Sequence, residues 1–536
     1  MRIDWLLAAA LAYRAEAQDI SGSRIRAHVR FLASDLLEGR GVGVRGGELA
    51  TEYLATQLAL LGVKPAGDGG GYYQRVPLIG VEPMPSATLS VTVKGQRLDL
   101  RWLEDFAGVT QRQAETAAIN ADVVFVGHGI TAPEYDWDDY NGVDVKGKVV
   151  VLFTNEPPSE DAKFFTGKAL TYYGRWTYKY EEAARRGAIS CLIVHTGATA
   201  SYGWDVVKSS WGREDMQVKI EGGKHALQFA GWITKAQGDR LFAAIGKTSD
   251  EMLQAANARD FKAMPLPVRI AGSFPAKVRA VESRNVVGII PGGDAVKKDE
   301  AVVFSAHWDH LGVGAAVNGD RIYNGAVDNA TGCGMVLDMA RAWQGLGQKP
   351  RRSAIFLFVT AEENGLRGSE YYGKHPLLPP GKTALNLNFD AFYPFGRTTD
   401  VVITGAERTT AWSAAQRAAQ RFRLTIKPDP HPEAGHYYRS DHFSLARVGV
   451  PAFSINTGTE FAGKPTAYGM KVFEDYNDRH YHQPSDEYQD SWDFSGIEEM
   501  ARFGFTIGVE VANSDKMPTW RKGDEFLQAR EKSGVR

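Results

Sequence analysis

Cysteine is scarce in this 536-residue sequence, occurring only at Cys191 and Cys333. Both stand among apolar or small residues, in "AISCLIV" and "ATGCGMV", which suits buried free thiols. Neither has a partner at the spacing of a zinc finger. We therefore expect two free cysteines and no disulfide-based scaffold.

The sequence also lacks an excess of charge of either sign. Its 62 basic and 64 acidic residues give a formal charge of -2. Such a balance gives no reason to expect nucleic acid or an anionic membrane as a partner. No apolar stretch reaches the roughly 20 residues that a membrane-spanning helix needs. We expect a soluble mature protein without a membrane span, and the sequence does not indicate its oligomeric state.

The N-terminus carries a short apolar segment, "WLLAAALA" (5–12), followed by "AEA" (15–17). This order resembles a signal peptide with a small-x-small cleavage site before Gln18. Asp4 and Arg14 depart from the pattern, and an amphipathic N-terminal helix is the alternative. We predict that residues 1–17 are a signal peptide and that the protein is secreted, to a periplasm or outside the cell.

The spacing of apolar residues changes twice along the rest of the chain. Residues 24–63 have helical apolar spacing, whereas residues 121–275 contain strand-like runs separated by glycine turns. The last half alternates strands with helices; the strands are expected at 285–292, 301–309, 353–361, 384–392, 400–405 and 451–456, and the helices near 330–346, 407–422, 441–448 and 495–513. Continuous apolar strands of this kind predict a three-layer α/β/α sandwich with a mainly parallel central sheet.

Residues able to bind a metal gather where the apolar runs end, which in a parallel sheet is one shared edge. They are His307, Asp309, Asp328, Glu362, Glu363, Asp390, His480, His482 and Asp486. Two imidazoles with several carboxylates favour zinc. Three carboxylate ligands would leave one divalent ion with net negative charge, whereas two ions and a bridging hydroxide would be neutral. The sequence therefore predicts two Zn²⁺ ions sharing a water, a common hydrolytic arrangement.

The order H-x-D, D-N-A-T-G, E-E, strand-end Asp and H-x-P-x-D resembles the M28 family of co-catalytic zinc peptidases. These motifs cover about 280–515, and "FLASDLLEGRGVG" with "GGELATEYLATQLALLGVKPAG" resembles the N-terminal part of the same domain. The block between them resembles a protease-associated (PA) insert. The resemblance implies a zinc exopeptidase fold with peptidase segments at 18–120 and 276–536, interrupted by a β-rich PA domain at 121–275.

The resemblance also implies a role for each residue of the site. His307 and Asp390 would bind one zinc, Glu363 and His482 would bind the other, and Asp328 would bridge them. Asp309 would be a carboxylate that orients the imidazole of His307, and Glu362 would be the general base.

Two further features follow from the same resemblance. Members of the family often have a cis peptide after the bridging aspartate, here Asp328–Asn329. In "HYYRSDHFSL" (436–445), Tyr437 has the spacing of a tyrosine that stabilises the oxyanion, with Tyr438 as the alternative. Both tyrosines could instead simply pack against or cap the following helix. Asp441 and His442 are expected to support the fold.

The predicted function is that of a metallopeptidase, a hydrolase that acts as an aminopeptidase on N-terminal residues of peptides. A carboxypeptidase of the glutamate-carboxypeptidase type is the nearest alternative. A glutaminyl-cyclase-like enzyme with one zinc and a non-enzymatic receptor-like relative are the others. The complete set of five ligands and a candidate base argues against the last two.

Overall fold

A computed structural model describes residues 19–200, 202–220 and 226–535. The predicted signal peptide, residues 1–17, lies outside this range. The chain forms two compact units, the first made of residues up to Pro77, Glu282–Pro430 and Arg439 onwards, and the second of Leu78–Val281 with His431–Tyr438. Two long strands, β2 (Tyr73–Pro83) and β14 (Ala276–Ile290), run across the unit boundaries.

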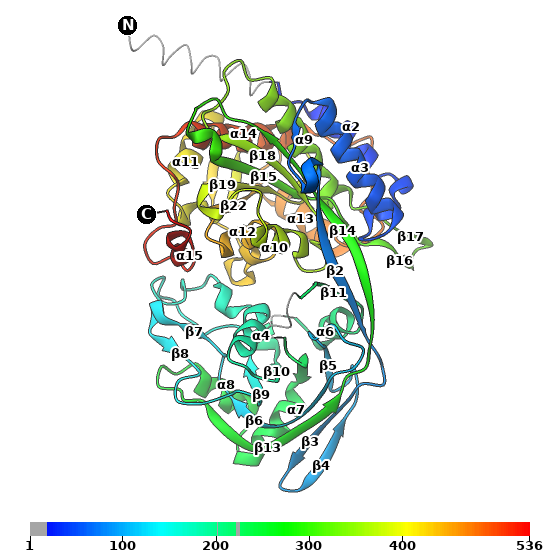
Figure 1. Cartoon of the computed structure of the whole chain (residues 1–536), viewed down its shortest axis with the longest axis vertical. Helices are drawn as coiled ribbons and strands as arrows, with labels where there is room; N and C mark the ends of the chain where they lie inside the picture. Colours follow the sequence, from blue (N-terminus) through cyan, green and yellow to red (C-terminus); the bar gives the residue numbers. More distant parts are fainter. Residues whose placement is uncertain (1–18, 201, 221–225, 536) are drawn as a thin grey trace. The chain divides into compact units, whose positions relative to one another are not determined.

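The first unit is built on a sheet whose strand order includes β14-β18-β15-β19-β22-β20-β21 (Figure 1). The bounds after β14 are β15 (Ala301–His307), β18 (Ser353–Val359), β19 (Thr383–Phe389), β20 (Asp400–Thr404), β21 (Thr425–Lys427) and β22 (Ala452–Thr457). The centre, β18-β15-β19-β22, is parallel. The pairs β14–β18 and β20–β22 are antiparallel, so the predicted parallel arrangement holds for the centre of a mixed sheet.

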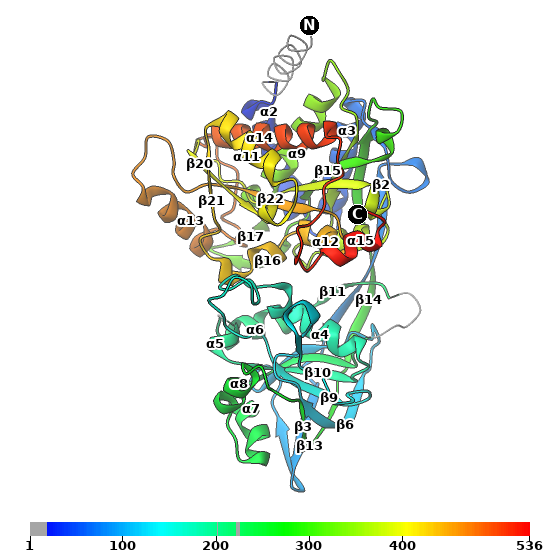
Figure 2. The same ribbon diagram turned by 90° about the vertical axis from the view of Figure 1, so that its left-hand side faces the viewer.

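Helices cover both faces of this sheet, which confirms the predicted α/β sandwich (Figures 1 and 2). On one face lie α2 (Gly22–Leu32), α9 (Thr331–Gln344), α11 (Trp412–Phe422) and α14 (Ser495–Asn513), and on the other lie α10 (Arg367–Lys374) and α12 (His442–Arg447). The unit also contains α3 (Arg45–Leu60), α13 (Ala467–Arg479), α15 (Leu527–Lys532), the short β1 (Lys64–Pro65) and the hairpin β16 (Gly312–Val317) and β17 (Asp320–Tyr323). Every residue of β15, β18 and β19 is buried, because helices cover both sides of each strand.

The second unit is organised around a sheet of order β4-β3-β13-β6-β9-β10-β12-β5. Its strands are β3 (Thr88–Val93), β4 (Gln96–Leu100), β5 (Phe106–Val109), β6 (Ala118–Phe125), β9 (Val149–Phe153), β10 (Ser190–His195), β12 (Phe229–Thr234) and β13 (Met264–Ser273), with β7 (Thr131–Ala132), β8 (Trp137–Asp138) and β11 (Asp215–Val218) outside it. Its helices are α4 (Trp176–Arg185), α5 (Gly197–Ala200), α6 (Trp204–Trp211), α7 (Lys235–Phe242) and α8 (Ser249–Ala256).

The second unit starts earlier than the predicted insert at 121–275, because β3, β4 and β5 belong to its sheet. β3 pairs with β13 and β5 pairs with β12. Residues 78–120 therefore fold with the second unit and not with the peptidase segment at 18–120. The assignment of this β-rich unit to the PA family stays a prediction.

Both cysteines are buried free thiols, as predicted. Within the described residues, no helix combines the length and the apolar character that crossing a membrane requires.

Candidate metal centre

Four of the predicted site residues stand at or just beyond the ends of the parallel strands at the centre of the sheet. His307 is the last residue of β15, Asp390 directly follows β19, and Glu362 and Glu363 come shortly after β18. Because β15 runs parallel to both neighbours, these strand ends meet at one edge. The sheet topology thus brings together residues that are far apart in the sequence.

Asp328 and His482 reach the same place from outside the sheet. Asp328 lies in the turn Ala326–Ala330 before α9, and the Asp328–Asn329 peptide is cis, as predicted. His482 lies just beyond α13 in a left-handed backbone conformation, with φ of 58°. The predicted ligand set therefore combines strand ends with two irregular segments.

The contacts place Asp328 between the two imidazoles. His307 Nε2 lies 3.1 Å from Asp328 Oδ1 and 3.0 Å from Asp390 Oδ1. His482 Nε2 lies 3.4 Å from Asp328 Oδ2 and 2.9 Å from Glu363 Oε2. Each carboxylate oxygen of Asp328 thus faces a different histidine, which is the arrangement expected for a bridging ligand.

These atoms fit a divalent metal. Ligand atoms of His307, Asp328 and Glu363 all lie within 4.8 Å of one another. Glu363 Oε1 and His482 Nε2 are buried without an aligned hydrogen bond in the described part of the chain. The Nδ1 atom of His307 bonds to the carbonyl oxygen of Asp309 at 3.1 Å, which leaves Nε2 free to coordinate. The residues present therefore suit the ions that the donor set predicts.

Asp309 contacts both His307 and the two glutamates, using different atoms for each, which the sequence does not reveal. Its main-chain carbonyl, not its carboxylate, is the hydrogen-bond partner of His307; the carboxylate lies 3.9 Å from Nδ1. The carboxylate accepts the backbone N–H groups of Glu362 at 3.1 Å and Glu363 at 3.4 Å. Asp309 thus fixes the turn that carries both glutamates as well as the imidazole.

The two adjacent glutamates have opposite electrostatic environments. Burial, reinforced by the charges of Asp390 and Glu363, raises the pKa of Glu362 well above its ordinary value, with His307 opposing the shift. Burial also acts to raise the pKa of Glu363, but the imidazoles of His310 and His482 outweigh it and lower that pKa to about 2. A pair whose pKa values are driven apart is typical of groups with different chemical roles.

Comparisons with known proteins agree with this geometry. The model of peptidase family M28 matches residues 285–504. The matched stretch makes up less than half of the 536-residue chain. That stretch, most of which lies in the first unit, is therefore similar to metallopeptidases, a class of hydrolases.

Similar proteins include a vacuolar membrane protease of Pyricularia oryzae, 37% identical over 86 residues, which are 16% of this chain and 8% of that protein. Leupeptin-inactivating enzyme 1 of Streptomyces exfoliatus is 25% identical over 206 residues, 38% of this chain and 42% of that enzyme. The matches thus span less than half of these curated relatives. An aminopeptidase structure from Aneurinibacillus sp. strain AM-1 is 18% identical, with a TM-score of 0.50 over 94% of this chain and 96% of that one. That likeness shows a shared fold.

A buried hydrogen-bonded chain supports Asp390 in the M28 unit. The hydroxyl of Ser440 donates to Asp390 Oδ2 at 2.5 Å and accepts from the amide of Asn388 at 2.7 Å. Ser305 in turn donates to Asn388 at 2.8 Å and accepts from Asn386 at 2.9 Å. Polar side chains are costly inside an apolar sheet unless every partner is present. Here the hydrogen bonds form a continuous chain that ends at one predicted ligand, while Oδ1 of Asn386 has no hydrogen-bond partner among the described residues.

Replacing Ser440 by alanine removes the last link of this chain. We expect zinc affinity to fall about 10-fold, the low end for a lost outer partner of a ligand. The measurement is zinc titration against a competing chelator. Ser353→Ala is the matched control, because its hydroxyl donates to Lys298 O where β18 begins. Equal affinities of Ser440→Ala and wild type would show that Asp390 needs no such support.

The structure adds two neighbours of the ligands to which the sequence assigns no role. His310 Nδ1 lies 2.5 Å from Glu363 Oε1. The carboxylate of Asp486 accepts the backbone N–H groups of Val327 at 3.0 Å and Asp328 at 3.1 Å. Asp486 is the last residue of the H-x-P-x-D motif, so its position was a usable signal. For His310 the only signal is its place next to Asp309.

Tyr437 lies in the short turn His436–Tyr438, which is counted with the second unit. It is buried, and its ring centroid is 5.2 Å from that of Tyr438. Its role toward an oxyanion stays a prediction.

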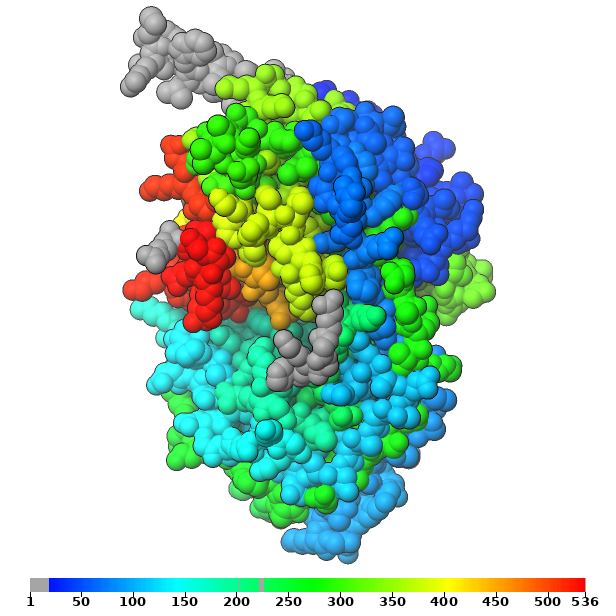
Figure 3. Space-filling view, viewed as in Figure 1, coloured from blue at the N-terminus to red at the C-terminus, as the bar shows by residue number. Residues whose placement is uncertain are grey.

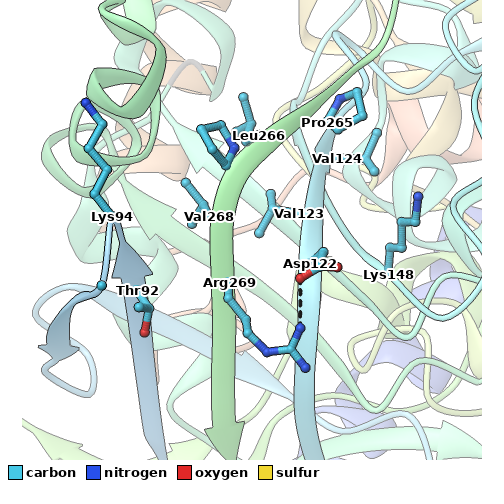
Figure 4. A pocket seen from close by; sticks show the side chains of 12 residues that line it. Thr92, Lys94, Asp122, Val123, Val124, Lys148, Pro265, Leu266, Val268 and Arg269 are labelled. Atoms are coloured by element: carbon cyan, nitrogen blue, oxygen red, sulfur yellow. Dashed lines mark hydrogen bonds and ion pairs between the residues drawn. The ribbon is translucent and has the colours of Figure 1, made fainter.

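A hollow of about 400 Å³ opens on the sheet of the second unit (Figure 4). Val123 and Leu266 are among its buried lining residues, and Arg269 pairs with Asp122 at 2.8 Å in the same lining. The lining contains a single acidic residue and no histidine. Its chemistry does not resemble that of the metal centre.

Proposed function

We propose that the M28 unit is a dinuclear zinc aminopeptidase, with His307 and Asp390 holding one ion, Glu363 and His482 holding the other, and Asp328 between them. The observation that carries the proposal is the placement of the two Asp328 oxygens, one toward each imidazole. Zinc bound there would supply a Lewis acid that polarises the scissile carbonyl and acidifies water.

Glu362 carries the proton transfers in this proposal. It takes a proton from the attacking water and returns it to the leaving amine. Two features support this role. Its carboxylate takes no part in the contacts that join the imidazoles to Asp328, Glu363 and Asp390. Its backbone is held by the carboxylate of Asp309, so the side chain is presented on a fixed turn.

An aminopeptidase is favoured over a carboxypeptidase because the ordered motifs resemble those of exopeptidases, among which aminopeptidases are prominent. The test compares aminoacyl arylamides with peptides that have a free C-terminus, each with and without a chelator. We expect chelator-sensitive release of the arylamine. Release of C-terminal residues alone would identify a carboxypeptidase, and turnover that resists the chelator would contradict the zinc mechanism.

Removal of the metal is also expected to destabilise the protein. Without cations, the carboxylates of Asp328, Glu363 and Asp390 repel one another in a buried site. An ion present at 100 times its dissociation constant adds about 2.7 kcal/mol to stability. For two ions we expect a fall in melting temperature of at least about 5 °C on chelation. Thermal unfolding with chelator, and again after zinc is restored, measures it; an unchanged transition would contradict zinc binding here.

We also propose that the protein is exported, on the basis of the apolar segment at 5–12 and the "AEA" that follows it. N-terminal sequencing of the protein recovered outside the cytoplasm tests this. The expected N-terminus is Gln18, whereas an intact N-terminus on a protein confined to the cytoplasm would contradict export.

A further inference from the structure

Arg40 is a fully buried arginine that forms no ion pair in the described part of the chain. Its guanidinium donates only to main-chain carbonyls. Nε donates to Trp308 O at 2.8 Å, and Nη2 donates to Gly325 O at 2.9 Å. Nη1 donates to Leu32 O and to Asn324 O, both at 2.6 Å. Four of its five N–H bonds are therefore used on the backbone of three separate segments.

Two of these segments carry metal ligands. Trp308 stands between His307 and Asp309, and Asn324 with Gly325 leads into the turn that contains Asp328. A single planar group thus ties the strand end of β15 to the segment that presents the bridging carboxylate. Asp486 binds the N–H groups at the other end of that segment.

The backbone that delivers Arg40 adopts an unusual conformation. Glu38, Gly39 and Arg40 are all left-handed, with φ of 48°, 66° and 50°. Only glycine adopts this conformation without cost, and a Cβ at Gly39 would lie 2.4 Å from Tyr323 O. The segment, dark blue in Figures 1 and 3, is thereby bent against the hairpin β16–β17. Strained backbone of this kind is typical of functional sites.

A buried cation is costly unless its hydrogen bonds are satisfied. Burial of Arg40 therefore destabilises the fold unless its bonds offset it, and the left-handed backbone at Glu38 and Arg40 adds to that destabilisation. An apolar side chain could fill this space if Arg40 only stabilised the fold. Four hydrogen bonds from one planar group do more, because they fix the positions of the carbonyls that accept them. Three of the four bonds end on the two segments that must hold a fixed separation between His307 and Asp328.

We propose that Arg40 is a positioning residue of the metal centre, holding the backbone beside His307 and before Asp328 at the spacing that the metals require. The proposal rests on the proposed zinc site. Lysine cannot substitute, because its ammonium is a point donor without the planar fork that reaches all four carbonyls.

The test uses the full-length chain with Arg40→Lys and Arg40→Gln. Zinc dissociation constants and stoichiometry are measured by competition with a chromogenic chelator, so no hydrolysis assay is needed. The matched control is Arg352→Lys. Arg352 is also fully buried and bonds to Val511 O at 2.8 Å and Ser514 O at 2.7 Å. Circular dichroism and melting temperature report folding of each variant.

Both Arg40 variants are expected to bind zinc 10–100-fold more weakly than wild type, the range for lost partners of metal ligands. Arg352→Lys should melt at a lower temperature than wild type but bind zinc with the same affinity. Folded Arg40 variants with affinity within twofold of wild type would overturn the proposal. Failure of both variants to fold would also overturn it, since Arg40 would then be a folding residue. A wild-type protein that binds no zinc would instead refute the proposed function.

Discussion

Glu362→Gln is expected to lower turnover by about 10²–10⁴-fold, the contribution typical of a general acid–base group. Glutamine occupies nearly the same volume but cannot accept the proton from water. The atoms proposed to bind the metals belong to other residues, among them Asp328 and Glu363. The variant should therefore keep the zinc content of the wild type while losing activity.

Glu363→Gln is the matched control for this experiment, because the two adjacent residues have the same side chain but different neighbours. Glu363 Oε2 contacts His482 at 2.9 Å, and the pKa of its carboxyl group is lowered to about 2. Its substitution should weaken zinc binding itself. Zinc analysis of both purified variants, alongside kcat, separates the roles. Full activity in Glu362→Gln would mean that the two glutamates have been assigned the wrong way round or that the mechanism is wrong.

Asp328→Asn is expected to have the largest effect on metal binding. Asp328 contacts both His307 and His482. An amide offers a single neutral acceptor oxygen in place of two charged ones, so both ions lose a ligand at once. We expect at least a 100-fold loss of zinc affinity, the upper end for removing even an outer partner of a ligand, and no measurable hydrolysis.

Asp338→Asn controls for the removal of a buried carboxylate in the same unit. Asp338 is also buried, but it pairs with Arg24 and Arg341 at 2.8 Å each. This control should lower the melting temperature and leave zinc affinity unchanged. Two zinc ions retained by Asp328→Asn, measured by metal analysis after dialysis, would rule out a bridging role.

The residues of the candidate metal centre could be grouped from the sequence because each one stands beside a strong local signal. His307 ends an apolar strand, and Asp390 follows another. Parallel pairing then forces the ends of such strands together. Asp328 lies before α9, in a segment whose residue order resembles a known motif. Local pattern and topology agree at these positions, so little tertiary information is needed to group them.

The supporting residues could not be predicted in the same way. Arg40 donates to main-chain carbonyls. Because nearly every residue has such a carbonyl, the sequence does not indicate which ones an arginine will reach. Ser440 reaches Asp390 across 50 positions through one hydroxyl. The start of the second unit could not be predicted either, because the pairing of β3 with β13 joins segments far apart in the chain. Such contacts depend on the folded geometry.

The most direct test of the dinuclear site is a crystal of the zinc-loaded protein measured on both sides of the zinc absorption edge. The account predicts two anomalous peaks per chain. One should lie between His307 and Asp390 and the other between Glu363 and His482, with Asp328 touching both. A single peak, or peaks away from these residues, would contradict the dinuclear site.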